Sequence, residues 1–212
     1  MKIGIIGATG KAGNLIVKEA IERGHAVTAI VRNVSKLADH IDSVLEKEIF
    51  DLQANDLMQF DVIVNAYGAP VGQEHLHVEA GNVLIEGIKG TNETRLIVVG
   101  GAGSLYVDEQ KTIRLIDTPE FPKEYFATAS NQAKNLEDLQ KSSINWTFIS
   151  PAAHFDPTGK RTGTYQLGKD NFIVNAKGNS YVSYADYAIA VLDEIEKPKH
   201  VNQRFTLVSE AE

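Results

Sequence analysis

The sequence contains no cysteine, which excludes disulfide bonds and thiolate chemistry. It has no apolar run near the ~20 residues that a membrane-spanning helix needs, and its apolar start is shorter than a signal-peptide core. Basic residues are outnumbered by acidic ones, 21 to 28, and the net charge of −7 argues against a nucleic-acid-binding surface. These absences predict a cytoplasmic protein that binds neither membranes nor nucleic acid.

What is present is typical of one globular domain. The 212 residues are 43% hydrophobic and 23% charged, which is enough to bury a sizeable core. The sequence has no internal repeat, low-complexity segment or linker. We therefore expect a single domain over residues 1–212.

A glycine-rich segment, GATGKAG, lies between an apolar segment (2–6) and one with helical spacing (14–23). Strand, glycine turn and helix form the context in which this pattern binds a dinucleotide; the alternative is a tight turn without a ligand. Gly7 would allow a sharp turn, Gly10 the approach of a pyrophosphate, and Gly13 close packing of helix on strand. The helix N–H groups would then face the phosphates. The predicted contacts are Gly7, Ala8, Thr9, Gly10, Lys11, Ala12 and Gly13.

Strands and helices alternate up to residue 150. The predicted strands are 2–6, 26–31, 44–50, 61–66, 95–99 and 146–149, and the predicted helices are 14–23, 53–58, 73–89 and 122–142. Near-continuous apolar strands are typical of a parallel sheet that helices cover on both faces. This pattern predicts an α/β fold, a Rossmann-type doubly wound parallel sheet with ligands at the carboxyl ends of its strands.

The last third departs from this alternation. We predict a hairpin from strands 163–167 and 171–174, a helix that opens with a capping box at 183–186, and a final strand at 204–208. Residues 1–150 would form the nucleotide-binding core, and residues 151–212 a small C-terminal cap on the substrate side.

Arg32 stands at the end of the second strand, where a protein that binds NAD usually places an acidic residue against the ribose 2′-hydroxyl. An arginine suits a 2′-phosphate instead, so we expect NADP(H) to be preferred over NAD(H). Asn33, Ser35 and Lys36 could add hydrogen-bond donors. The alternative is a solvated arginine at the end of a strand.

Two further strand ends contribute candidates for cofactor binding. Asp51 and Leu52 follow the third strand and would suit the adenine ring, although Asp51 could equally cap the next helix. Ala66, Tyr67 and Gly68 follow the fourth strand, whose end should pass beneath the cofactor.

Together these residues resemble the atypical short-chain dehydrogenase/reductases. The similarity lies in GATGKAG (7–13), the Val31–Arg32 pair, NAYG (65–68) and SYADYA (183–188). Within that superfamily the chain is most similar to the NmrA-like NAD(P)H-binding group, which includes NADH-flavin reductases and biliverdin-IXβ reductase. The stretches VVGGAGSL (98–105) and ISPAAHF (149–155) resemble its flavin-reductase branch. The resemblance implies a Rossmann domain that holds NAD(P)H, with a small C-terminal region over the nicotinamide.

The chain departs from the Tyr-x-x-x-Lys pair that reductases of this superfamily usually carry. Lys134 fits the lysine and would orient the nicotinamide ribose, but Ser130 stands in the place of the tyrosine. Tyr125 is on the opposite side of the helix from Lys134. Ser104 is a candidate for the serine that assists the tyrosine, in competition with Gly103. The alternative for Lys134 is a surface lysine.

Without that phenol, reduction of a simple ketone is disfavoured, because a positioned acid contributes ~10²–10⁴-fold to such a step. A conjugated acceptor spreads the incoming charge, so positioning alone is the main requirement. We therefore predict an NAD(P)H-dependent oxidoreductase that reduces a flavin, a quinone or a similar small molecule. Tyr125, His154 and Phe155 are the candidates to line the acceptor pocket.

Two other functions stay open. A non-catalytic, NADP-binding redox sensor of the NmrA type would also tolerate the missing tyrosine. A nucleotide-sugar epimerase or dehydratase is disfavoured by Ser130 and by the short cap. His75 and His77 point in different directions on one helix, so no metal site is expected. The pattern does not distinguish a monomer from a homo-oligomer.

Overall fold

The computed structural model describes residues 1–37, 41 and 43–211. The strands are β1 (Lys2–Ile6), β2 (Ala26–Val31), β3 (Ser43–Glu46), β4 (Val62–Asn65), β5 (Arg95–Val99), β6 (Asn145–Ser150), β7 (His154–Asp156), β8 (Gln166–Gly168), β9 (Tyr181–Ser183) and β10 (Gln203–Val208). The α-helices are α1 (Lys11–Glu22), α2 (Ala54–Leu57), α3 (Leu76–Gly87), α4 (Lys123–Lys141) and α5 (Tyr184–Glu196), and the 3₁₀ helices are η1 (Val34–Lys36), η2 (Ile49–Asp51) and η3 (Leu115–Asp117).

Eight strands form one sheet in the order β3-β2-β1-β4-β5-β6-β10-β8. All neighbours pair in parallel except β10 and β8. From β1 the chain first builds outward through β2 and β3, and then returns to β4 on the other side of β1. The order therefore reverses between β1 and β4, and ligands of doubly wound sheets bind at such a point. The Rossmann-type fold predicted from the sequence is confirmed.

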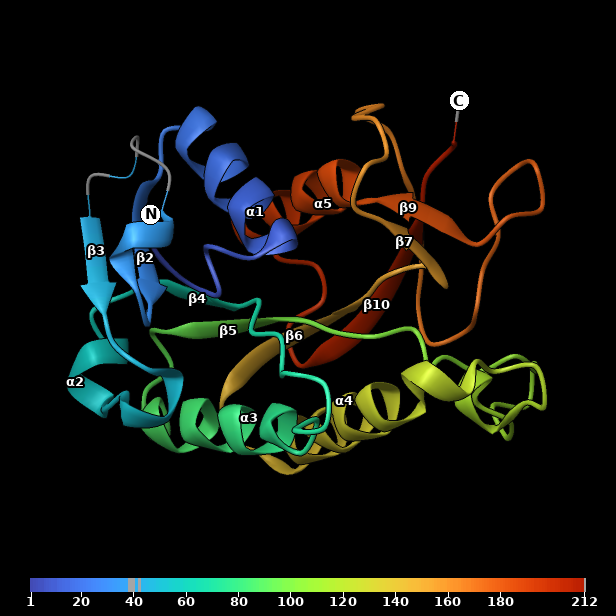
Figure 1. Cartoon of the computed structure of the whole chain (residues 1–212), viewed down its shortest axis with the longest axis horizontal. Helices are drawn as coiled ribbons and strands as arrows, with labels where there is room; N and C mark the ends of the chain where they lie inside the picture. The colour runs from blue at the N-terminus through green and yellow to red at the C-terminus, as the bar shows by residue number, and fades with distance from the viewer. Residues whose placement is uncertain (38–40, 42, 212) are drawn as a thin grey trace.

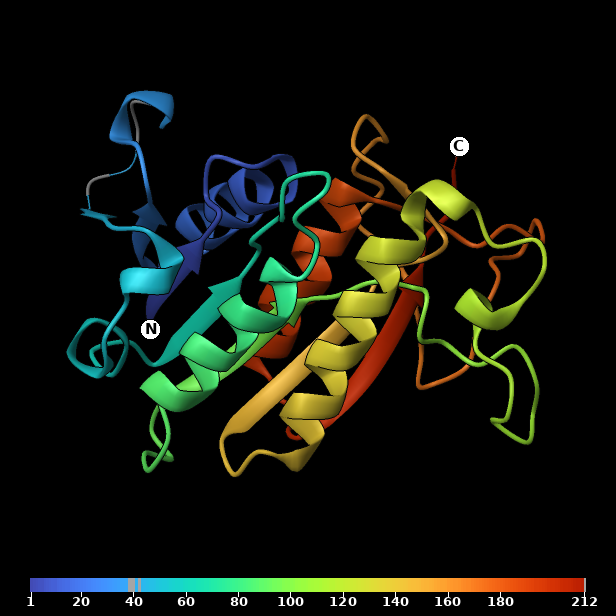
Figure 2. The ribbon, with the colours of Figure 1, turned by 60° about the horizontal axis from the view of Figure 1, so that its bottom comes forward.

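Helices cover both faces of this sheet (Figure 1). Helices α1 and α5 pack together on one face, and α3 and α4 lie side by side on the other, in front of the sheet in Figure 2. Side chains of β1 point into both cores. Ile3 and Ile5 belong to the core beneath α1 and α5, and Ile6 belongs to the core beneath α3 and α4. Burial on both faces explains the near-continuous apolar strands.

Several boundaries differ from those expected. Helix α1 begins at Lys11 directly after the glycine turn, and α3 begins only at Leu76. The third strand ends at Glu46, because the chain then turns through η2 and places Ile49 in the core.

The predicted C-terminal hairpin is wrong. Strand β8 pairs antiparallel with β10, and Asn171 forms only an isolated bridge with Tyr106. Strand β10 lies beside β6, and α5 packs on α1, so both elements continue the main sheet and its helical layer. What extends beyond the carboxyl ends of the strands is the small parallel sheet of β7 and β9. No helix in the described part of the chain is long and apolar enough to cross a membrane.

Candidate nucleotide and acceptor site

The glycine turn brings the ends of β1 and β4 into contact. Gly7 has a φ of +76°, and a Cβ there would collide with the carbonyl of Ala66. A Cβ on Gly13 would collide with the carbonyl of Gly7, so α1 packs tightly against the end of its own strand. The amide of Ala66 donates to the carbonyl of Ile6 at 3.1 Å. Gly7 and Gly13 thus have the conformational roles expected of them.

The first turn of α1 presents unpaired backbone amides. Gly10 is its N-cap residue, no side chain caps it, and its first turn carries no acidic residue. Gly10 donates to the carbonyl of Gly7 at 2.8 Å, but the amides of Lys11 and Ala12 have no hydrogen-bond partner among the described residues. Thr9, Gly10 and Lys11 are exposed, whereas the Ala8 side chain is buried. Free amides and a positive dipole end are the features that bind a phosphate group.

Arg32 is exposed at the end of β2 and forms no hydrogen bond or ion pair with the residues that the structure describes. Burial raises the pKa of the Tyr67 phenol, and the negative charge of Glu48 raises it further. The positive charge of Arg32 lowers the same pKa. Arg32 and Tyr67 therefore lie near each other, on either side of the glycine turn. Ser35 offers fewer donors than expected, because both its amide and its hydroxyl donate to the side-chain oxygen of Asn33.

Of the two residues predicted to contact the adenine, Asp51 and Leu52, the structure exposes the first and buries the second. Asp51 is exposed in η2, but the Leu52 side chain is only 3% exposed and belongs to the core beneath α3 and α4. The neighbouring Phe50 is 37% exposed and meets Tyr67 edge-on at 5.9 Å between ring centroids. Tyr67 in turn meets His77 at 6.1 Å. Phe50 and His77 were missed from the sequence, where an aromatic residue directly before Asp51 was the available signal.

The glycines after β5 approach protein side chains. A Cβ on Gly101 would collide with the Gln132 side chain, and one on Gly103 would lie 2.7 Å from the Cβ of Ala129. Both contacts come from α4. The packing of α4 against this segment thus explains why small residues stand there. Gln132 is the α4 side chain that reaches the carboxyl end of β5.

Lys134 lies elsewhere on α4. At about 100° per residue, it is about 140° from Ala129 and about 160° from Leu136, both buried. It is exposed and has no hydrogen-bond or ion-pair partner in the described chain. The structure therefore places Lys134 on the face of α4 opposite the one that packs against the rest of the protein.

Ser104 is buried in a polar contact with β10. Arg204 donates to both the hydroxyl and the carbonyl of Ser104, each at 3.0 Å. The same guanidinium pairs with Asp170 at 3.0 Å. These bonds join the segment after β5 to the segment after β8, so Ser104 has a structural role in this fold.

The three residues expected around the acceptor are not gathered into one cluster. Tyr125 is 62% exposed in the first turn of α4 and makes no ring contact among the described residues. His154 and Phe155 are consecutive on β7, so their side chains point to opposite faces. His154 is exposed and meets Tyr181 edge-on at 5.2 Å. Phe155 packs inward against Tyr184 at 3.9 Å.

Two tyrosines of α5, Tyr184 and Tyr187, lie near the carboxyl end of β6. Tyr187 is fully buried and donates to the carbonyl of Ile149 in β6 at 2.7 Å, which fixes this face of α5 against the strand ends. Tyr184 is one turn earlier on the same face. Its phenol has no hydrogen-bond partner among the described residues. Burial raises the pKa of Tyr184, and Asp156 adds to the rise, so this phenol is protonated at neutral pH.

Comparison with known proteins agrees with this geometry. A protein-family model described as NAD(P)H-binding matches residues 7–198. The uncharacterized protein YwnB of Bacillus subtilis (strain 168) is 70% identical over 213 residues, with all of both chains covered.

Solved structures of similar sequence share the whole fold. SP1627 of Streptococcus pneumoniae, named as a candidate NADH-flavin reductase, is 45% identical, with 99% of this chain and 100% of that chain covered and a TM-score of 0.95. A candidate epimerase from Bacteroides thetaiotaomicron is 34% identical, with 100% and 99% covered and a TM-score of 0.85. With its glycine turn, its bare helix N-terminus and its family match, this chain belongs to the NAD(P)H-binding family of Rossmann-fold proteins.

Proposed function

We propose that this protein is an NAD(P)H-dependent oxidoreductase that transfers hydride to a small conjugated acceptor, such as a flavin or a quinone. The observation that carries the proposal is the uncapped first turn of α1 at the point where the strand order reverses. The name of the pneumococcal relative, a candidate NADH-flavin reductase, supports the choice of acceptor.

The residues around the turn fit a dinucleotide. The amides of Lys11 and Ala12 would bind the pyrophosphate, and Arg32, free of other partners, would bind a 2′-phosphate and so favour NADP(H). Phe50 and Tyr67 would contact the adenine. The bound nicotinamide would supply the hydride, and the protein would hold its ring against the acceptor.

At the acceptor end the available groups differ from the usual tyrosine and lysine. Gln132 offers an amide for the nicotinamide ribose in place of an ammonium group, since Lys134 faces away. Tyr184 offers a protonated phenol on the α5 side of the strand ends, where it could donate a proton to a reduced acceptor. His154 lies on β7, four residues after the end of β6, and its ring is exposed.

A redox sensor that binds NADP(H) without turnover is the second candidate. It is favoured by one observation: the α4 side chain at the end of β5 is a neutral amide, which cannot transfer a proton as the usual pair does.

Turnover separates the two functions. NADPH oxidation should be measured with FMN, riboflavin and dichlorophenolindophenol as acceptors, alongside calorimetry of NADPH binding. Turnover with any acceptor supports the reductase. Tight binding without turnover across the panel would support the sensor, and absence of both would contradict the nucleotide site itself.

A further inference from the structure

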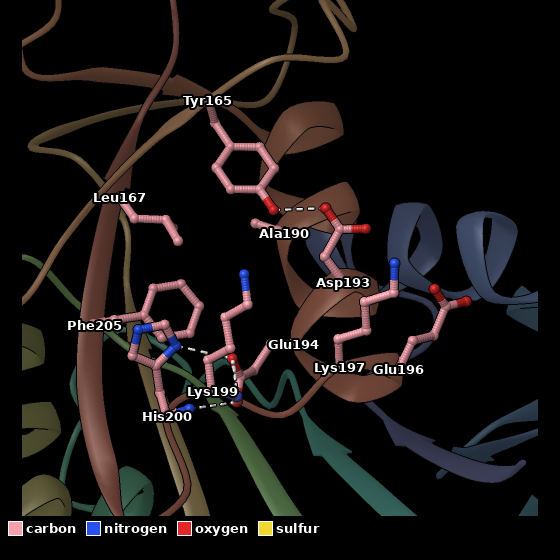
Figure 3. A pocket seen from close by; sticks show the side chains of 10 residues that line it. All are labelled: Tyr165, Leu167, Ala190, Asp193, Glu194, Glu196, Lys197, Lys199, His200 and Phe205. Carbon is pink, nitrogen blue, oxygen red and sulfur yellow. Dashed lines mark hydrogen bonds and ion pairs between the residues drawn. The ribbon is translucent and has the colours of Figure 1, made fainter.

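A hollow lies between α5 and the β8–β10 edge of the sheet, away from the glycine turn. It is about 250 Å³ in volume and is formed by the end of α5, the following segment, and strands β8 and β10 (Figure 3). Lys199 and His200 precede β10, so they stand at the amino end of that strand. The glycine turn instead follows the carboxyl end of β1. The hollow is therefore separate from the proposed nucleotide site.

Three carboxylates border this hollow, and each is already paired with an arginine outside it. Arg23 binds Asp193 at 2.7 Å and Glu196 at 3.1 Å. Arg95 binds the buried Glu194 at 3.3 Å. Glu194 also accepts from the amide and ring of His200, at 3.0 Å and 2.9 Å. These carboxylates are therefore engaged in holding α5 to its neighbours.

Two lysines at the same place have no such partner. Lys197 and Lys199 form no ion pair within 4 Å among the described residues. Figure 3 shows the Lys199 amine extending into the middle of the hollow, between Phe205 and Asp193. The Lys197 amine lies on the other side of Asp193 in the same view, beside Glu196, and its charge acts on Asp193. The Lys199 amine is therefore the cation within the hollow that a negatively charged group could bind.

The remaining walls are apolar or aromatic. Leu167, on edge strand β8, is 47% exposed and points into the hollow in Figure 3. The His200 ring packs on Phe205 at 4.4 Å between centroids, and the Tyr165 hydroxyl is held by Asp193 at 2.6 Å. A ligand here would meet rings and an aliphatic side chain on one side and the Lys199 ammonium group on the other.

We propose that this hollow binds a small monoanionic carboxylate with a flat apolar body, of the size of a benzoate ion. The carboxylate would bind the ammonium group of Lys199, and the apolar body would cover Leu167 and the His200 ring. The volume is just below that of drug-sized ligand pockets, which fits a ligand of this size. The site does not depend on the proposed reductase activity.

The test is a titration of the intact protein with benzoate, followed by ¹H–¹⁵N NMR. We expect saturable shifts at the amides of Leu167, Lys199 and His200, with a millimolar Kd that persists when NADP⁺ is present. Lys199→Gln should weaken binding about two- to fivefold, the range of an exposed ion pair. Lys18→Gln, an exposed lysine of α1, is the matched control and should leave the Kd unchanged.

Two other probes separate charge from apolar contact. Benzyl alcohol keeps the ring without the charge, and inorganic phosphate keeps a charge without the ring, so both should bind more weakly than benzoate. Equal binding of either probe would overturn the proposal. So would shifts confined to the glycine turn, an unchanged Kd in Lys199→Gln, or the absence of saturable shifts at the three amides.

Discussion

Replacing Arg32 by alanine should change nucleotide preference without changing stability. Arg32 is exposed and has no partner among the described residues, so its removal costs the fold nothing. A hydrogen bond to a charged group contributes about 1.5–3 kcal/mol. Because this site is open to solvent, we expect the lower end of that range, which is about a tenfold loss of NADPH affinity. NADH lacks the 2′-phosphate, so its affinity should stay nearly unchanged.

Isothermal titration of both nucleotides into wild type and Arg32→Ala measures this difference. Arg114→Ala is the matched control, because Arg114 is bound to Asp117 in the segment before α4. It should leave both affinities unaltered. Equal losses of NADPH and NADH affinity in Arg32→Ala would refute the assignment of Arg32 to the 2′-phosphate.

Three further changes test the surrounding structure. Gly13→Ala places a methyl group against the Gly7 carbonyl, and we expect a loss of about 1–3 kcal/mol in thermal denaturation together with weaker NADPH binding; unaltered binding would contradict the role of the turn. Gln132→Ala should lower turnover or cofactor affinity, whereas Lys134→Ala should alter neither; the reverse result would restore the ribose role to Lys134. Burial raises the pKa of Asp170, but bonds from Lys111 and Arg204 outweigh it and lower the pKa overall. Asp170→Asn should therefore destabilise the protein at pH 7, and its difference from wild type in urea denaturation should shrink below about pH 4; a constant difference would contradict this.

The sheet could be predicted from the sequence up to residue 150, because its signals are local. The apolar segments, the glycine turn and the helical spacing each lie within a few residues of chain. The C-terminal part could not be predicted in this way. Strand β8 pairs with β10, about 40 residues later, so its partner depends on how α5 packs on α1. Two short segments near Gly168 therefore resembled a hairpin.

In the site, too, the features that depend on local sequence could be predicted, and those that depend on tertiary packing could not. The proposed phosphate end lies at the turn itself, and the conformation of Gly7 and the close packing at Gly13 could be predicted from their positions in the motif. On α4, Lys134 was predicted by analogy with the Tyr-x-x-x-Lys pair. That analogy does not determine which face of the helix packs against the rest of the protein. The small residues Ala129 and Ala133 mark the face that packs, and that face includes Gln132. Only the tertiary structure reveals that Arg204 donates a hydrogen bond to the Ser104 hydroxyl.

The most direct test of the nucleotide site is calorimetric titration of NADPH into the purified protein. We expect one nucleotide to bind per chain with micromolar affinity, and Gly13→Ala to weaken that binding. Binding that is undetectable at millimolar NADPH, or that Gly13→Ala leaves unaltered, would contradict the proposal that the first turn of α1 holds the pyrophosphate.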